Sequence, residues 1–379
     1  MLYSVPTLDD VDLRVISEID DQRTRLRHLL VQPRRWKGAL RRNLFARAVR
    51  GSNSIEGYDV SLDDAIALVE DEAPLDADRR TSLEIIGYRN ALTYIQQLAD
   101  DEHFSLDESL LRSLHFMMLS HDLDKSPGQY RRGEIFVRDD ERGVIVYEGP
   151  DYALVPGLMK ELVGQLGAHE LCPVFVRAAM AHLNLVMIHP FRDGNGRMAR
   201  ALQTLVLARE QILSPEFSSI EEWLGRNTTE YYEVLAETGA GSWHPERDAH
   251  NWVRFNLRAH HMQAQTVLRR VHVAERLWTE VTEELERAGL PERSAWAMFD
   301  AASGLRVRTA AYAKDAEIGM PTAARDMRML VAAGYVQAQG ETKARFYMAT
   351  PTLRDMRARA AHDRQLLVDP YGNPAGSAA

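Results

Sequence analysis

The most informative stretch of this sequence runs His189-Pro190-Phe191-Arg192-Asp193-Gly194-Asn195-Gly196-Arg197-Met198-Ala199-Arg200. Proline disfavours helix in the residue before it, so we expect a helix to end at His189. Gly194 and Gly196 allow backbone conformations that expose successive N–H groups, and such a nest at a helix start attracts phosphate. The stretch therefore predicts a helix, a short loop and a second helix with an anion site at its start.

The side chains of this stretch are those that a polyphosphate site requires. Arg197 and Arg200 lie three residues apart, so both guanidinium groups lie on one face of the second helix. Asp193 is a hard oxygen ligand that suits Mg²⁺ bound to the same phosphates. His189 can accept a proton near neutral pH. The alternative, a capped helix turn with a surface ion pair, does not require all four side chains at these offsets.

This stretch resembles the Fic signature, H-x-F-x-[DE]-G-N-G-R-x-x-R, at every defined position. The resemblance extends over residues 45–260 and includes the family's flap hairpin within 128–156 and the helices that carry Asn227, Tyr231-Tyr232 and Trp243. It implies a mainly helical fold and an enzyme that transfers a nucleotide monophosphate, usually AMP from ATP, to a hydroxyl group of a target protein or of itself. Many relatives self-associate, so the resemblance also allows a homodimer.

The resemblance also implies a role for each residue of the motif. His189 would deprotonate the target hydroxyl, Asp193 would hold Mg²⁺, and Phe191 would be a packing anchor. The phosphates of ATP would be bound by the Gly194–Gly196 backbone with Asn195 at the α-phosphate, and by Arg197 and Arg200 at the β- and γ-phosphates. On the flap, the target peptide would be aligned by strand addition along Ile135, Phe136 and Val137.

A second motif, Ser52-Asn53-Ser54-Ile55-Glu56-Gly57, resembles the inhibitory helix [ST]-x-x-x-E-[GN] of the same family. By this resemblance Glu56 would pair with Arg200 and compete with the γ-phosphate for it. The alternative is an ordinary helix with Glu56 as a solvated charge. Tyr231 and Tyr232 line the adenine pocket in the family, yet either could equally be a core residue. Gly239 stands where some relatives have an asparagine.

Helical periodicity divides the rest of the chain of 379 residues. We expect helices over 10–31, 36–50, 61–70, 79–98, 107–120 and 152–167, and a β-hairpin formed by 135–137 and 144–147. The expected regions are an N-terminal helical region (1–100) with the inhibitory helix at about 50–58, a Fic core (101–265), a linker helix with a second domain (266–360), and a flexible tail (361–379).

The region 266–360 is predicted to end in a winged helix-turn-helix. Two helices, the second starting at Pro321 and ending near Gly334, precede two short strands around a Gly-Glu-Thr-Lys turn. Residues 301–360 contain ten Lys or Arg against five acids, although the whole chain has a formal net charge of −9. Arg325, Arg328, Lys343 and Arg345 could contact DNA, and the alternative is a protein-contact module.

Three functions remain open from the sequence. The leading one is a Mg²⁺-dependent protein adenylyltransferase restrained by Glu56; the others are a deadenylylating enzyme and a nucleotide-sensing transcription regulator. The single cysteine, Cys172, excludes an internal disulfide and a thiolate metal cluster. We found no signal peptide and no apolar run long enough for a transmembrane helix, so we expect a cytoplasmic protein without membrane partners.

Overall fold

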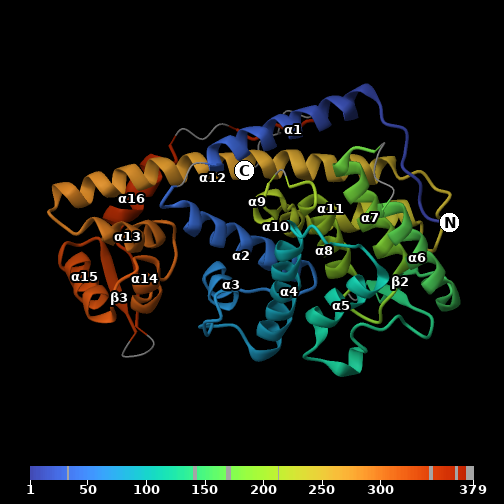
Figure 1. Cartoon of the computed structure of the whole chain (residues 1–379), viewed down its shortest axis with the longest axis horizontal. Coiled ribbons are helices and arrows are strands. Elements are labelled where there is room, and N and C mark those ends of the chain that lie inside the picture. The colour runs from blue at the N-terminus through green and yellow to red at the C-terminus, as the bar shows by residue number, and fades with distance from the viewer. Residues whose placement is uncertain are drawn as a thin grey trace. The chain divides into compact units, whose positions relative to one another are not determined.

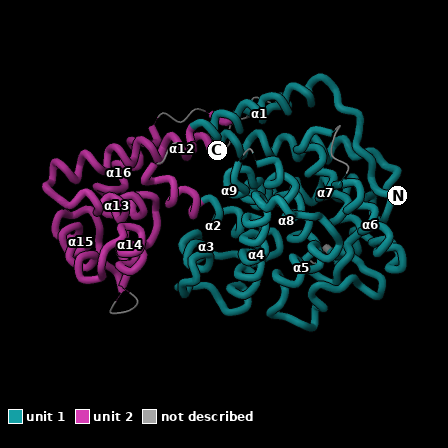
Figure 2. Tube along the Cα trace, viewed as in Figure 1, with its two compact units in different colours: residues 1–28, 44–265, 368–379 teal, residues 29–43, 266–367 magenta. Residues whose placement is uncertain are grey.

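Helices dominate the structure, a computed structural model that describes residues 1–31, 34–139, 143–167, 172–211, 213–340, 345–362 and 366–372. Within these residues the strands form two separate antiparallel pairs. The described residues group into two compact units (Figure 2). Unit 1 comprises those of 1–28, 44–265 and 368–379, and unit 2 comprises those of 29–43 and 266–367. The mainly α fold class is as predicted.

Unit 1 contains the motif and most of the helices (Figure 1). Its elements are α1 (Asp10–Val31), α2 (Lys37–Ile55), α3 (Leu62–Val69), α4 (Arg79–Leu98), α5 (Glu108–Leu119), η1 (Leu123–Lys125), β1 (Phe136–Asp139), β2 (Val144–Glu148), η2 (Tyr152–Leu154), α6 (Val155–Gly167), α7 (Val174–Ile188), α8 (Asn195–Ala208), α9 (Pro215–Ser218), α10 (Glu221–Arg226), α11 (Thr228–Gly239) and the first part of α12 (His250–Arg287). The helices α1, α2 and α12 each include residues of both units.

Side-chain caps fix where several of these helices begin. Ser61 accepts a hydrogen bond from the Asp64 N–H at the start of α3, as its sequence predicts. Asp78 and Asp107 do the same for α4 and α5. Each cap satisfies a backbone N–H that has no partner inside the helix, and it stabilises the helix by about 1 kcal/mol.

The two helices that flank the motif form the centre of unit 1. Nearly every residue of α7 and of α8 is buried, including charged and polar residues of α8. The helices α4, α5 and α6 pack around this pair. A loop between two helices that are buried on almost all sides is held firmly at both ends, so the motif residues have little freedom to move.

The helix α2 is longer than predicted, because the stretch that begins at Gly51 continues the helix to Ile55. A Cβ atom on Gly51 would lie 2.5 Å from the Glu221 carbonyl oxygen of α10. The glycine therefore permits a close approach of two helices rather than a helix end. Asn53 and Ser54 donate side-chain hydrogen bonds to the carbonyl oxygens of Val49 and Gly51, as polar residues inside helices often do.

The predicted hairpin is present, with Phe136 opposite Glu148 and Val137 opposite Tyr147. A β-bulge separates Val137 from Arg138. The hairpin is attached to unit 1 by the buried Tyr147, whose hydroxyl donates to the Met187 carbonyl oxygen in α7 at 2.8 Å. The flap is thus anchored at its base, close in sequence to His189.

Unit 2 contains the helices and the hairpin expected near the end of the chain. Its remaining elements are η3 (Glu292–Ser294), α13 (Ala295–Ala302), α14 (Thr309–Asp315), α15 (Met320–Ala332), β3 (Val336–Gln339), β4 (Phe346–Ala349) and α16 (Pro351–Ala360). Val307 adds a bridge to Tyr347 of β4, which the sequence did not indicate. The assignment of this unit as a winged helix stays a prediction, and Lys343 lies outside the described residues.

A buried carboxylate holds the helices of unit 2 together. Asp326 of α15 accepts two hydrogen bonds from the Arg293 guanidinium, at 2.7 and 3.0 Å, and one from the Tyr312 hydroxyl at 2.9 Å. Because three hydrogen bonds from two residues converge on a fully buried acid, the orientation of α15 relative to α14 and η3 is fixed.

Part of the segment predicted as a flexible tail is packed within unit 1. The Tyr371 hydroxyl donates to Asp12 at 3.1 Å, and the Arg258 guanidinium lies 2.7 Å from the Asp369 carboxylate. These side-chain contacts fix residues 369–371, which composition alone could not indicate; 363–365 and 373–379 lie outside the described residues. Among the described helices, none combines the length and the apolar character needed to cross a membrane.

Candidate active site

The loop between α7 and α8 bends through two residues in the left-handed conformation. His189 ends α7 with φ 51°, and Gly194 precedes α8 with φ 75°. Glycine adopts this conformation at little cost, whereas histidine does so only where its surroundings hold it. The predicted helix–loop–helix is therefore present. The backbone N–H groups of Gly194, Asn195 and Gly196 lie at the start of α8.

Asn195 closes the loop from inside. Its side-chain amide donates to the Phe191 carbonyl oxygen and its side-chain oxygen accepts from the Phe191 N–H, both at 2.9 Å. The side chain is buried and both of its ends are engaged. A contact from Asn195 to a phosphate would therefore come from its backbone N–H.

His189 is oriented through one ring nitrogen. Its Nδ1 lies 3.0 Å from the Val186 carbonyl oxygen, to which it donates, so Nε2 is the nitrogen free to accept a proton. Burial lowers the pKa of His189, with a further contribution from the Arg131 charge. A lowered pKa keeps the imidazole neutral at pH 7, which is the form that a general base requires.

Arg131 organises the loop from the flap side, and no sequence motif identified it. It donates through Nε to the His189 carbonyl oxygen at 2.9 Å and through its backbone N–H to that of Pro190 at 2.9 Å. It also donates to the carbonyl oxygens of Gly133 and Pro150. One buried guanidinium thus joins the base of the flap to the residue that carries the proton acceptor.

His115 is a second residue that the sequence did not single out. Its ring stacks on Phe191, with centroids 3.7 Å apart, its Nε2 lies 2.9 Å from the Asp193 carbonyl oxygen, and its Nδ1 accepts from the Gly128 N–H at 2.8 Å. Burial lowers the pKa of His115 to about 4. The neutral ring is therefore a structural bridge from α5 to the loop, and Phe191 is the packing anchor that was predicted.

Asp193 is half exposed and already holds a cation. One oxygen accepts from the Gly194 N–H and the other lies 2.6 Å from the Lys125 ammonium group. Burial alone would raise the pKa of Asp193, but Lys125 and Arg197 outweigh it, so the pKa is lowered and the group is an anion. An ionised oxygen that accepts a cation beside an anion nest fits a Mg²⁺ ligand.

The predicted contact between Glu56 and Arg200 is present, and Ser52 takes part in it. Arg200 NH2 lies 2.6 Å from Glu56 Oε1 and 3.0 Å from the Ser52 carbonyl oxygen, while Arg200 Nε donates to Ser52 Oγ at 2.7 Å. The Arg200 side chain is 1% exposed and that of Glu56 is 26% exposed. Burial alone would lower the pKa of Arg200, but the Glu56 charge raises it above its ordinary value.

The Glu56 carboxylate also lies over the start of α8. A Cβ atom on Gly196 would lie 2.5 Å from Glu56 Oε1, so the carboxylate approaches the backbone where the anion nest begins. A side chain at this position would displace the Glu56 carboxylate. The Glu56 carboxylate therefore pairs with the Arg200 guanidinium and also fills the space beside the anion nest that a phosphate would need.

Arg197 has a different partner, which sequence reasoning missed. Its NH1 lies 2.5 Å from Glu84 Oε2 of α4, and both side chains are 1% exposed. The other Glu84 oxygen lies 3.1 Å from the Lys125 ammonium group and 3.3 Å from His121 Nε2. Burial alone would raise the pKa of Glu84, but Arg197 and then Lys125 lower it to about 2.

The two adjacent tyrosines lie in different surroundings. Tyr231 is 1% exposed and its hydroxyl lies 3.0 Å from His182 Nε2, which places it in the core. Tyr232 is 46% exposed and donates to the Ile55 carbonyl oxygen at 3.1 Å, next to Glu56. Of the pair, Tyr232 is the one available to a ligand at this site.

The flap residues differ in exposure along the strand. Phe136 is exposed, whereas Ile135 and Val137 are partly buried. On the opposite strand Val144, Ile145 and Val146 are exposed. An apolar hairpin edge of this kind can add a strand from another chain.

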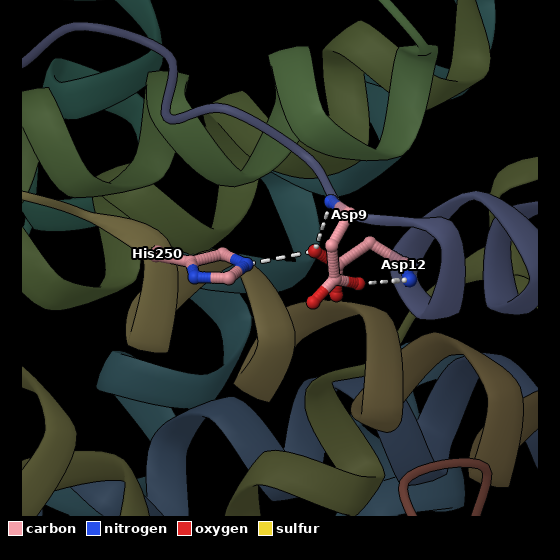
Figure 3. A group of neighbouring side chains, drawn as sticks. All are labelled: Asp9, Asp12 and His250. Atoms are coloured by element: carbon pink, nitrogen blue, oxygen red, sulfur yellow. Dashed lines mark hydrogen bonds and ion pairs between the residues drawn. The ribbon is translucent and has the colours of Figure 1, made fainter.

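One group of side chains away from the motif has the composition of a metal site. Figure 3 shows Asp9 and Asp12 of the N-terminal region with His250 of α12. His250 Nε2 lies 2.7 Å from Asp12 Oδ2, and Arg254 Nε lies 3.0 Å from Asp12 Oδ1. Because the arginine and backbone N–H groups already bind these carboxylates, the group acts as a clasp between α1 and α12.

Residues 105–207 match the model of the Fic/DOC family, and this range contains the complete loop and both helices that flank it. The match identifies residues 105–207 as a Fic domain. Glu56 and Glu84 lie before the matched residues, so the two acids that hold the motif arginines come from outside them.

Two curated relatives are similar to this chain. A protein adenylyltransferase Fic of Nematostella vectensis is 26% identical over 254 residues, which are 64% of this chain and 54% of the relative. The protein adenylyltransferase fic-1 of Caenorhabditis elegans is also 26% identical, over 64% of this chain and 46% of its own. The chain thus spans about half the length of these relatives.

The fold is shared with a crystal structure of a Fic family protein from Desulfovibrio desulfuricans, with a TM-score of 0.60. The two chains are 21% identical, and the match covers 92% of this chain and 99% of the other. Fic-1 of C. elegans matches with a TM-score of 0.52 and 23% identity, over 68% of this chain and 71% of the other.

Proposed function

We propose that this protein is a protein adenylyltransferase, which transfers AMP from ATP to a hydroxyl side chain of a target protein or of itself. The observation that carries the proposal is the arrangement of the 189–200 motif: a neutral, oriented histidine at the end of α7, an anion nest at the start of α8, and two arginines on the first turns of α8. The names of the curated relatives support the same activity.

In the proposed reaction His189 Nε2 accepts the proton of the target hydroxyl. The hydroxyl oxygen then bonds to the α-phosphorus of ATP, the bond from that phosphorus to the β-bridging oxygen breaks, and pyrophosphate leaves. The N–H groups of Asn195 and Gly196 stabilise the charge that develops on the α-phosphate, while the Gly194 N–H donates to Asp193. Val186 and Arg131 contribute by holding His189 in place.

The remaining phosphates are assigned to Arg197 and Arg200, which lie on α8 after the nest. Asp193 would hold Mg²⁺, which would neutralise phosphate charge when bound. Tyr232 is the aromatic ring placed to contact the adenine. Phe136, with Ile135 and Val137, would align the target peptide on the flap by strand addition.

We infer that Glu56 restrains this activity. Its carboxylate pairs with Arg200 and lies beside Gly196, so the γ-phosphate and Glu56 compete for the same guanidinium group. The partial exposure of Glu56 supports a contact that can open, since its side chain needs no passage through the core to leave. Ser52 would keep Arg200 in position after Glu56 has left.

The proposal is tested by the intact mass of the protein after incubation with ATP and Mg²⁺. We expect the Glu56→Gly variant to gain the mass of one AMP more rapidly than the unmodified sequence does. The Glu56→Gly, His189→Ala double variant should gain none, because general base catalysis contributes about 10²–10⁴-fold. No gain of mass in any variant, combined with no labelling of proteins in native lysate, would overturn the proposal.

The same site could also remove AMP, with Glu56 positioning a water molecule. The two directions are separated by supplying an adenylylated target and following AMP release. Release that requires Glu56 and His189 would support deadenylylation, whereas release that is unchanged in Glu56→Gly would exclude the role of Glu56 in it.

A second candidate function rests on unit 2. Arg325 and Arg328 are exposed on α15, while Asp326 between them is buried and neutralised by Arg293. This helix therefore presents positive charge on its outer face, which favours contact with the phosphates of duplex DNA. A nucleotide-sensing transcription regulator would combine this contact with the site in unit 1.

The DNA contact is tested by titrating the whole chain with duplex DNA at several salt concentrations. We expect weak binding that falls as salt rises and that is lost in the Arg325→Glu, Arg328→Glu double variant. Absence of binding at low salt would exclude it.

A further inference from the structure

Lys125 is a cation beside the proposed phosphate site that belongs to no motif. Its ammonium group lies 2.6 Å from Asp193 Oδ2 and 3.1 Å from Glu84 Oε1. Its side chain is only 17% exposed, although lysine is almost always found with its ammonium group in water. A lysine in this position must have a structural or a binding reason.

The backbone around Lys125 is fixed next to the 189–194 loop. The short helix η1 ends at Ser126, which has φ 52° and donates its N–H to the Leu123 carbonyl oxygen at 3.0 Å. From the other side, Arg192 NH1 donates to the Asp124 carbonyl oxygen at 2.8 Å. The backbone of Lys125 is therefore fixed, and its ammonium group points to Asp193.

Within the described residues, the hydrogen bonds of the ammonium group leave one donor free. An ammonium group has three N–H donors, of which Glu84 and Asp193 take two. Among the described residues the next carboxylate is Asp122, at 3.9 Å, which is too far for a hydrogen bond. One donor is thus left beside Asp193, the residue that stands next to the anion nest.

The charges around Lys125 also favour a phosphate. Glu84 is shared between Lys125 and Arg197, so one buried acid holds two cations near the start of α8. Without Lys125 or a bound Mg²⁺, the Asp193 carboxylate would repel an approaching triphosphate. Lys125 neutralises that carboxylate and still has a donor to offer.

We propose that Lys125 is a further phosphate-binding residue of this site, positioned by Glu84 and directed at the triphosphate of the nucleotide. This inference rests on the proposed function, since it takes the triphosphate to bind along the nest and Arg197. Lys125 adds a third cation to Arg197 and Arg200, from η1 rather than from α8.

The test measures binding of ATP with Mg²⁺, and separately of inorganic tripolyphosphate, by titration calorimetry. The background is the Glu56→Gly, His189→Ala double variant, which neither competes through Glu56 nor turns over. In that background Lys125→Met should weaken both ligands about tenfold, as loss of one charge-assisted hydrogen bond does. Lys125→Arg should recover part of the affinity, and the exposed Lys160→Met on α6 should change nothing.

A second measurement needs no substitution at Lys125. Amine-reactive labelling of the Glu56→Gly variant, read by peptide mass, should show Lys125 protected several-fold by tripolyphosphate while Lys160 is labelled equally. Equal affinities of Lys125→Met and its background, or labelling of Lys125 that tripolyphosphate leaves unchanged, would overturn the inference. Because both readouts measure binding, they remain readable even if no adenylyl transfer is found, and that result alone would count against the proposed function.

Discussion

The two arginines of the motif are each held by one glutamate, but the two pairs are built differently. Glu84 comes from the middle of α4, is fully buried with Arg197, and also binds Lys125. Glu56 lies just beyond the end of α2, keeps a quarter of its side chain exposed, and contacts one arginine that Ser52 also binds. The buried pair Glu84–Arg197 can separate only at a large cost in free energy, whereas the partly exposed Glu56 can leave Arg200 at a smaller cost. We therefore expect Glu84 to position its arginine permanently and Glu56 to occupy its arginine reversibly.

The largest expected effect is on stability at the buried pair. The Glu84→Ala variant leaves Arg197 buried without its carboxylate, and loss of one partner of such a pair costs about 3–5 kcal/mol. The free energy of unfolding, measured by urea denaturation, should fall by this amount. The matched control is Glu102→Ala, an exposed glutamate after α4, which should leave it unchanged. A loss below about 1 kcal/mol at Glu84 would show that the pair is not fixed.

The second effect concerns acid pH. The folded protein lowers the pKa of Glu84 to about 2, from an ordinary value of 4.5. A lowered pKa contributes stability that is fully present above the unfolded value and is lost as the pH falls from 4.5 towards 2, by up to about 3 kcal/mol. The Glu84→Gln variant should lose that part of the pH dependence. Parallel stability curves of the two proteins below pH 4.5 would contradict the assignment.

A smaller stability effect is expected at the exposed pair. In Glu56→Ala the guanidinium of Arg200 keeps both of its bonds to Ser52, so the cost should be about 1.5 kcal/mol, at most half of that at Glu84. Thermal unfolding of the two alanine variants side by side gives this ratio. Equal losses of stability in the two variants would mean that Glu56 and Glu84 contribute equally to the fold.

The smallest effect is expected at Tyr232. The Tyr232→Phe variant removes only the hydrogen bond to the Ile55 carbonyl oxygen, at a partly exposed site, and should lower the free energy of unfolding by less than about 1 kcal/mol. Since that bond helps to hold the residue before Glu56, ATP should bind about twofold more tightly. Weaker binding of ATP would instead indicate that the hydroxyl itself contacts the nucleotide.

The sequence predicted those parts of the site whose chemistry is local. The glycines and Pro190 of the motif determine the loop, and the Ser52–Glu56 motif located the residues that meet Arg200. It could not indicate Glu84, because a glutamate inside an amphipathic helix has no feature that reveals a partner 113 residues away. The same separation in sequence explains why three other residues were missed, since the loop residues that they contact also lie far along the chain: Arg131, His115 and Lys125.

Two other differences have equally specific causes. The helix predicted over 36–50 stopped before Gly51, yet this glycine lies within α2 and lets it pass close to α10, a neighbour that only the tertiary structure shows. Tyr231 and Tyr232 could not be separated by sequence, because neighbours on a helix point about 100° apart and either could face the core. The structure places Tyr231 in the core and Tyr232 at the surface.

The most direct test of the contrast between the two pairs is the affinity for ATP with Mg²⁺, measured by titration calorimetry in the His189→Ala background. Removing the reversible occupant with Glu56→Gly should tighten binding about tenfold, whereas disturbing the fixed partner with Glu84→Gln should weaken it several-fold. Opposite signs are the predicted result. An unchanged or weaker affinity in Glu56→Gly, or a tighter one in Glu84→Gln, would contradict the different roles assigned to the two glutamates.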